Sequence, residues 1–199
     1  MHPLRELKPE QKQNIKVTTL NQDVTVHHKE IVVGAVEVRS RTVTASGKKP
    51  RRAVYAGRLR LCHVPDRGGK TLSGFVQGNV EPGAVVRTDG WGGYDELADM
   101  GYVHEPLVLD GDPEKTDNHL PMIHIAFSNL KTWLNGTHHG VGKEHLQAYL
   151  DEFVFRFNRR LYPMTAFASV LGIGMSLTGP TYRELYDGKW NHHTRSLMP

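Results

Sequence analysis

Cysteine is almost absent from this sequence, because Cys62 is the single cysteine among 199 residues. One cysteine excludes an internal disulfide, and it excludes a zinc ribbon, which needs several cysteines at fixed spacing. Cys62 lies inside an apolar run that is typical of a strand. We therefore expect it to be a buried structural thiol.

Long apolar segments and familiar nucleotide-binding signatures are missing as well. No stretch approaches the roughly 20 apolar residues of a membrane-spanning helix, and no signal-peptide pattern opens the chain, so we expect a cytoplasmic protein. The sequence contains no glycine-rich loop of the Walker or Rossmann type and no GxSxG elbow. The segment GGKT at 68–71 resembles the end of a Walker loop but lacks its upstream glycine.

The composition that remains is that of an ordinary globular domain. The chain is 38% hydrophobic and 23% charged, and its length fits one domain with a core large enough to fold without disulfides or metals. The formal net charge is +4. A mildly basic balance fits a polyanionic partner such as nucleic acid, although many basic proteins bind none.

The first half of the chain reads as a series of strands. Residues 1–28 lack strong periodicity, so we expect a mobile arm there, within which TTLNQDVTV could form a short strand. Residues 39–57 form a basic segment that fits either a solvated hairpin tip or a DNA contact. Four later runs predict strands: EIVVGAVEV (30–38), RLRLCHV (58–64), AVVRT (84–88) and YVHEPLVL (102–109).

Other segments have apolar residues spaced three or four positions apart, which predicts helices. Residues 72–80 have helical periodicity and lie between the predicted strands at 58–64 and 84–88. Three further helices are expected near Met122–Leu134, Lys143–Asn158 and Met164–Leu171, with Gly136 ending the first of them. Strands with one crossover helix, followed by helices, indicate an α/β layer fold.

The stretch AVVRTDGWGGY places one carboxylate, Asp89, at the end of a predicted buried strand. Open α/β sheets bind their ligands at the carboxyl ends of strands, so Asp89 is a candidate catalytic or metal-binding residue. The glycines that follow allow a sharp exit and a close approach of backbone or phosphate. The alternative is an aspartate that only caps the turn after its strand.

His124 and Lys131 are the second candidates, about 35 residues beyond Asp89. Helical spacing puts them on one face with Ser128 between them. A helix across the end of the sheet could hold His124 over Asp89 as a metal ligand or proton carrier. Lys131 could reach a phosphate as a point charge. The alternative is a histidine and a lysine on a solvated helix face.

The segment GTHHG at 136–140, followed by His145, also raises the possibility of a zinc site. Histidine pairs bind zinc when a third ligand stands at a suitable spacing, but no HExxH pattern or nearby cysteine completes the set. A tight turn between helices is the preferred interpretation. A histidine-rich metal-binding protein that uses His138, His139 and His145 remains the weakest alternative.

Several ordered motifs resemble one family. The segments EIVVGAVEV, NVEPGAVVRTDGWGGYDEL, SNLKTWLNGTHHGV and YLDEFVFRFNRR are similar to the catalytic domain of bacterial insertion-sequence transposases of the DDE type with an ISXO-like domain. The similarity runs from roughly Lys29 to Tyr186. It divides the chain into a non-family arm (1–28), a catalytic domain (29–162) and a C-terminal helix and tail (163–199).

The resemblance implies a ribonuclease-H-like fold, with a mixed sheet and flanking helices that hold two Mg²⁺ (or Mn²⁺) ions for phosphoryl transfer on DNA. It implies a homo-oligomer that acts on the element's terminal repeats and on target DNA. Asp89 matches the family's second catalytic aspartate and His124 the third position, both as metal ligands. Lys131 matches the lysine that follows on the same helix.

One expected residue is missing from the motif pattern. The family's first catalytic aspartate stands on a strand shortly before the segment EIVVGAVEV, and residues 1–28 contain only Asp23, whose neighbours do not fit. We therefore expect a truncated transposase with reduced or no strand-transfer activity, because such losses disable the whole catalytic unit. The alternative is a non-catalytic DNA-binding fragment that modulates full-length transposase.

Overall fold

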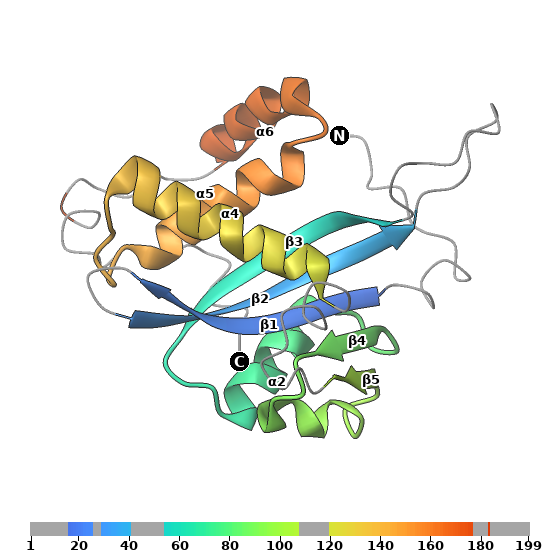
Figure 1. Ribbon diagram of the computed structural model, residues 1–199. Helices are drawn as coiled ribbons and strands as arrows, with labels where there is room; N and C mark the ends of the chain where they lie inside the picture. Colours follow the sequence, from blue (N-terminus) through green and yellow to red (C-terminus); the bar gives the residue numbers. More distant parts are fainter. Residues whose placement is uncertain (1–15, 26–28, 41–53, 108–119, 177–182, 184–199) are drawn as a thin grey trace, which may run out of the picture.

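The computed structural model describes residues 16–25, 29–40, 54–107, 120–176 and 183. A sheet of five strands forms its centre, in the order β3-β2-β1-β4-β5 (Figure 1). The strands are β1 (Lys16–Thr25), β2 (Lys29–Ser40), β3 (Val54–Val64), β4 (Val85–Thr88) and β5 (Val103–Pro106).

The sheet is mixed, and β1 lies in its middle. β1 pairs antiparallel with β2 along its whole length, and β2 pairs antiparallel with β3. On its other edge β1 pairs parallel with β4, and β4 pairs parallel with β5. The strand predicted within TTLNQDVTV is confirmed as part of β1. The domain boundary predicted at residue 28 stays a prediction. β1 precedes that boundary and pairs with β2 on one edge and with β4 on the other.

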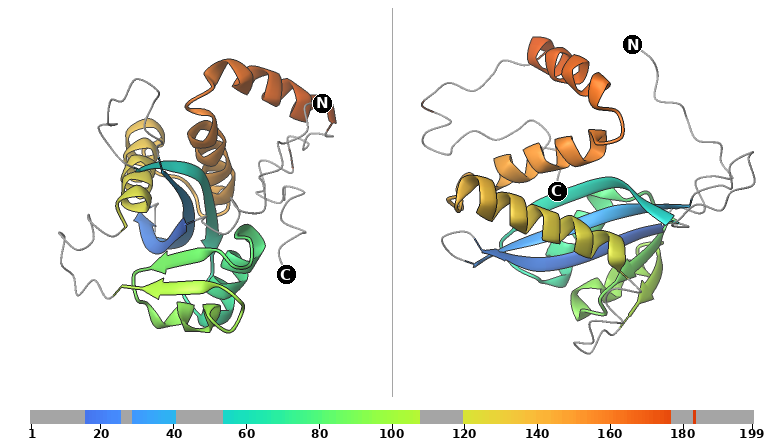
Figure 2. Two further views of the ribbon diagram at one scale, coloured as in Figure 1. Left: turned by 90° about the vertical axis from the view of Figure 1, so that its right-hand side faces the viewer. Right: turned by 45° about the horizontal axis from the view of Figure 1, so that its top comes forward.

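Helices cover both faces of the sheet. α4 and α5 lie on one face, whereas α2 and the 3-10 helix η1 lie beside β4 on the other, and α6 stands outside α5 (Figures 1 and 2). The helices are α2 (Gly69–Asn79), η1 (Gly92–Leu97), α4 (Pro121–His138), α5 (Leu146–Arg159) and α6 (Pro163–Ser176). This is the α/β layer arrangement that the sequence predicts.

The apolar run of β2 explains why both faces carry helices. Val32 and Val36 belong to the core beneath α4 and α5, and Val33 and Ala35 to the core on the α2 side. Successive residues of a strand point to opposite faces, so a continuous apolar run requires two cores. At Gly34 a Cβ atom would lie 3.0 Å from the Phe127 ring of α4, so the absence of a side chain there lets α4 approach the sheet closely.

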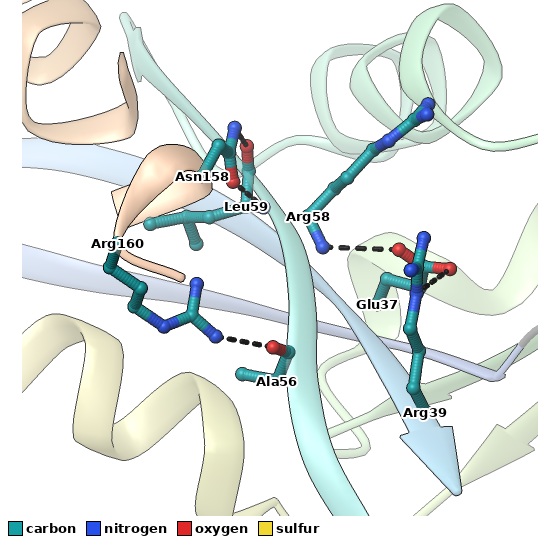
Figure 3. Close-up of polar contacts among 7 residues, drawn as sticks. All are labelled: Glu37, Arg39, Ala56, Arg58, Leu59, Asn158 and Arg160. Carbon is teal, nitrogen blue, oxygen red and sulfur yellow. Dashed lines mark hydrogen bonds and ion pairs between the residues drawn. The ribbon is translucent and has the colours of Figure 1, made fainter. Parts of the chain in front are cut away.

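Side chains of α5 satisfy the outer edge of β3 (Figure 3). The Asn158 amide accepts a hydrogen bond from the Leu59 backbone N–H at 2.7 Å and donates one to the Leu59 carbonyl at 3.0 Å. Gln147 accepts from the His63 N–H at 2.9 Å, and Arg160 donates to the Ala56 carbonyl. These bonds replace a sixth strand and block the edge against pairing with another chain.

The predicted strands and helices are confirmed in type, and their bounds differ in places. The prediction that Gly136 ends the first C-terminal helix is wrong, because α4 continues through Gly136 to His138. The helix ends where His139 adopts φ of 51° and Gly140 a φ of 107°. Cys62 is half-buried, not fully buried as expected. Among the described residues, no helix is long and apolar enough to cross a membrane.

Candidate functional site

Asp89 stands directly beyond the last residue of β4. Val86 and Thr88 are fully buried, and Val86 packs in the core on the α2 side. Because side chains alternate along a strand, Asp89 is directed toward the opposite face, which α4 covers. Gly90 then takes a φ of 74°, so the chain leaves the strand sharply, as the glycine run predicts.

The Asp89 carboxyl is partly buried, and positively charged groups lie near it. Burial raises the pKa of the Asp89 carboxyl above its usual value. Three neighbours oppose that shift in the pKa: the Trp91 backbone N–H, which donates to the carboxylate at 3.2 Å, and the charges of His124 and Arg67. A desolvated carboxylate beside cationic side chains is a common arrangement in sites that bind metals or phosphates.

α4 brings His124 to this carboxylate. The buried side chains of Ile123 and Phe127 fix the helix on the sheet, and half-buried His124 is close enough for its charge to lower the pKa of Asp89. Lys131 is two turns further along the same helix, roughly 10 Å by the rise of an α-helix. Within the described residues, the charges that influence the pKa of Asp89 do not include Lys131. The structure therefore brings two of the three predicted residues together.

Arg67 and Trp91 complete this group, and the sequence reasoning missed both. The Trp91 indole N–H donates to the Arg67 carbonyl at 3.1 Å, which ties the loop after β3 to the loop after β4. At Gly93 a Cβ atom would lie 2.8 Å from the same Arg67 carbonyl. The segment PDRGG before α2 was the available signal, but no pattern places it beside Asp89.

His104 of β5 contacts Thr88, the residue before Asp89. Its Nε2 atom lies 2.9 Å from the Thr88 hydroxyl oxygen, and that oxygen accepts a long hydrogen bond of 3.4 Å from the Gly90 N–H. Burial lowers the pKa of His104, and the nearby charge of Asp95 opposes this shift. β5, through His104, thus helps to hold the turn that carries Asp89.

A family comparison decides what kind of domain carries this arrangement. The model of the ISXO2-like transposase domain matches residues 4–158, which is more than three quarters of the chain. The chain belongs to the ISXO2-like transposase domain family. No curated protein and no solved structure matches it. Because the match begins at residue 4, it includes β1 as well as the motifs around Asp89 and α4.

The register between β1 and β4 shows which residue of β1 lies beside Asp89. Thr18 of β1 pairs with Arg87 of β4 in parallel register. Continuing that register by two residues places Leu20 opposite Asp89, and Asp23 lies three residues further along β1. The neighbouring strand therefore offers no carboxylate at the register position of Asp89.

The residues of the site do not fit the divalent metals that the family implies. Mg²⁺ takes oxygen ligands in octahedral geometry, and a pair of metals needs several carboxylates. The described part of the chain contains no group of three or more histidine, cysteine, aspartate or glutamate side chains that could hold an ion. Asp89 and His124 alone supply one carboxylate and one imidazole.

The histidines between α4 and α5 have structural positions in this transposase domain. The ring of His138 packs edge-on against Trp133 and Tyr149, with ring centroids 4.7 Å apart in both cases. His139 ends α4 in a left-handed conformation, and His145 precedes the first turn of α5. Within the described residues these three do not form a metal-ligating group.

Proposed function

We propose that the chain is a ribonuclease-H-like catalytic domain of an insertion-sequence transposase whose active site has lost its first carboxylate. The topology supports this fold. Three antiparallel strands, β1 to β3, are followed by two strands parallel to β1, and α4 brings His124 near Asp89 at the carboxyl end of β4. Asp89 is then the second catalytic aspartate and His124 occupies the third position.

The geometry supports separate roles for the remaining residues. The half-buried carboxylate of Asp89 lies beside half-buried His124, and we assign this pair to a metal site that a further carboxylate would complete. One carboxylate and one imidazole alone lack the oxygen ligands that Mg²⁺ or Mn²⁺, the cofactor implied by the family, would need for charge stabilisation at a DNA phosphate. We assign Lys131, further along α4, to a contact with DNA phosphate at a distance from Asp89.

The observation that carries the proposal is the residue opposite Asp89. Two carboxylates on adjacent strands are needed to share a metal, and the β1 register offers Leu20 in that place. Removal of one member of a catalytic unit lowers its rate about as much as removal of all. We therefore conclude that the chain binds DNA and cleaves it very slowly or not at all.

Restoring the missing carboxylate tests this conclusion directly. The variant Leu20→Asp is expected to gain Mn²⁺-dependent nicking of a plasmid that carries the element's terminal repeats. The double variant Leu20→Asp/Asp89→Ala should lose that gain, and Asp23→Ala, the matched control, should change nothing. Robust metal-dependent cleavage by the unmodified chain, abolished by Asp89→Ala, would contradict the proposal.

DNA binding without cleavage is the second part of the proposal. The net charge of +4 and the cationic side chains near Asp89 favour contacts with phosphates. Such contacts release counterions, so affinity for duplex DNA should fall by at least tenfold between ~50 and ~200 mM salt. Affinity that does not change over this range would argue against phosphate contacts. A chain that binds but does not cleave could also modulate an intact transposase by competing for its DNA.

A further inference from the structure

Trp91 presents a large aromatic ring at the surface, two residues beyond Asp89. The residue is 50% exposed, whereas tryptophan is on average highly buried in folded proteins. Its neighbours Gly90 and Gly92 have no side chains, so neither can cover the ring from the adjacent positions. Among the described residues, no other aromatic ring and no guanidinium stacks on it. The exposed part of the ring is therefore open to another molecule.

The exposed ring is held in a fixed position. Its indole N–H donates to the Arg67 carbonyl at 3.1 Å, and the Trp91 backbone N–H donates to the Asp89 carboxylate at 3.2 Å. A Cβ atom at Gly93 would lie 3.0 Å from Trp91 Cδ1, so the five-membered ring packs against the backbone there. A bond between the two loops needs only an N–H donor, which a glutamine also has. The bond thus does not account for the exposed aromatic surface.

The distance from Trp91 to Asp89 is comparable with the spacing of nucleotides in DNA. Two residues of chain span at most ~7 Å. Successive nucleotides of one DNA strand are ~3.4 Å apart along the helix axis. A DNA phosphate beside Asp89, which is part of the proposed function, therefore has a neighbouring base within reach of the Trp91 ring.

The charges around Trp91 favour a base over a phosphate as the group that contacts the ring. The charge of Arg67 acts on Asp89, whereas Asp95 and Glu96 of η1 are exposed just beyond Trp91. A surface with charge of both signs attracts phosphate weakly, because phosphate contacts require lysine and arginine. A base is uncharged, and every base has a π-face that stacks on an aromatic side chain.

We propose that Trp91 holds an unstacked DNA base next to the phosphate at Asp89. A base must leave its own stack to reach the ring, and this costs least where the DNA is already single-stranded. Trp91 therefore favours single-stranded ends over intact duplex. The inference rests on the proposed function for the phosphate at Asp89. It is measured by binding in the absence of metal, whereas the proposed function is measured by cleavage.

The affinity of the full chain for two matched DNA molecules tests the contact. Both are duplexes with a single-stranded overhang of the same length, made of thymidines in one and of abasic sites in the other. Their phosphates are equal in number, so the ratio of the two Kd values isolates the contribution of the bases. The unmodified protein should bind the thymidine overhang about fivefold more tightly or better, because each stacked base contributes at least this much.

Two variants and a control separate the ring from its hydrogen bond. Trp91→Ala should bind both overhangs equally. Trp91→Phe keeps an aromatic ring and loses the indole N–H, so it should retain most of the preference for thymidine. Phe167→Ala is the control, because it removes a ring that is 71% exposed on α6, which Figure 2 shows on the far side of α5 from the sheet. This control should keep the full preference.

Tryptophan fluorescence reports the contact without a change at Trp91. The chain has three tryptophans, so Trp91 is the only one left in a Trp133→Phe/Trp190→Phe protein. Acrylamide should quench its emission in the free protein, because the ring is exposed. The thymidine overhang should protect the ring from acrylamide, and the abasic overhang should not.

Three outcomes would overturn the inference. One is equal affinity of the unmodified protein for the two overhangs. Another is an equal loss of preference in Trp91→Phe and Trp91→Ala, which would assign the effect to the bond with Arg67. The third is emission from Trp91 that acrylamide does not quench, which would show that another part of the chain covers the ring. Salt-dependent binding without a preference for bases would leave the proposed function standing, and robust cleavage by the unmodified chain would contradict the proposed function alone.

Discussion

The side-chain amide of Asn158 holds both backbone groups of Leu59, a residue 99 positions earlier in the chain. The carboxamide has the same donor and acceptor as a peptide bond, so one side chain of α5 replaces the hydrogen bonds of a neighbouring strand. Figure 3 shows this pair together with the bond from Arg160 to Ala56. A helix residue thereby closes the edge of the sheet and fixes α5 on it.

The first prediction concerns this pair. Asn158→Ala should lower the free energy of unfolding by about 2–3 kcal/mol, because two backbone groups lose their partner in a half-buried place. Asn158→Asp keeps the acceptor for the Leu59 N–H but puts a carboxylate oxygen 3.0 Å from the Leu59 carbonyl oxygen, so repulsion between the two acceptors should make its cost at least as large. Urea denaturation followed by circular dichroism measures both. Equal stability of all three proteins would show that water replaces the amide.

The second prediction compares two glycines. Gly93→Ala should cost about 1–3 kcal/mol, because its Cβ would meet the Arg67 carbonyl and Leu72 at 2.8 Å. Gly136→Ala is the matched control, since this glycine lies within α4 with nothing within 4 Å of the added atom. The control should gain about 0.5–1 kcal/mol from helix propensity. A Gly93→Ala protein as stable as the original would mean that the Arg67–Trp91 contact can shift.

The third prediction concerns Asp89 and stability. Burial raises its pKa in the folded protein, so the folded state holds the proton more tightly than the unfolded state. The stability that the neutral Asp89 carboxyl gives to the folded state is present at low pH, and it is lost as the pH rises through the pKa of the folded state. Asp89→Asn should therefore raise the melting temperature at pH 7, and the difference should shrink toward pH 3.8. A variant less stable than the original at pH 7 would contradict this.

The fourth prediction concerns His104, with the opposite sign of pH dependence. Burial lowers the pKa of His104 below the usual 6.5, so the unfolded state binds a proton at this residue more tightly than the folded state does. The protein should lose stability as the pH falls from 6.5 through the lowered pKa. His104→Gln keeps a polar group near Thr88, and it should reduce the change of the melting temperature with pH between pH 5 and 7. An unchanged slope would assign the pH dependence to other groups.

Much of the fold follows from the sequence because its patterns are local. The apolar run of β2 and the spacing of Ile123, Phe127 and Leu130 determine strand and helix before any tertiary contact forms. The end of α4 does not follow, because Gly136 is a more common stop than His139, and only the backbone shows which of the two adopts the left-handed conformation.

The site was predictable only in part, for a physical reason. Asp89 and His124 could be found because each sits at a typical place, a strand end and a helix face. Arg67, Trp91 and His104 come from loops and a short edge strand, and their approach to Asp89 depends on how α2 and β5 pack. The assignment of Leu20 to the place opposite Asp89 required the strand register, which a slip of one residue would change.

The position of β1 in the sheet also sets the order in which the domain can fold. β1 to β3 form antiparallel neighbours that are close in the chain, whereas Lys16 meets Val85 only after about 70 residues have intervened. Long loops close more slowly than short ones, so the three-stranded part should form first and β4 should join it later. The turn that carries Asp89 is then among the last parts to take shape. A mutation that slows the docking of β4 would delay the site without disturbing the early sheet.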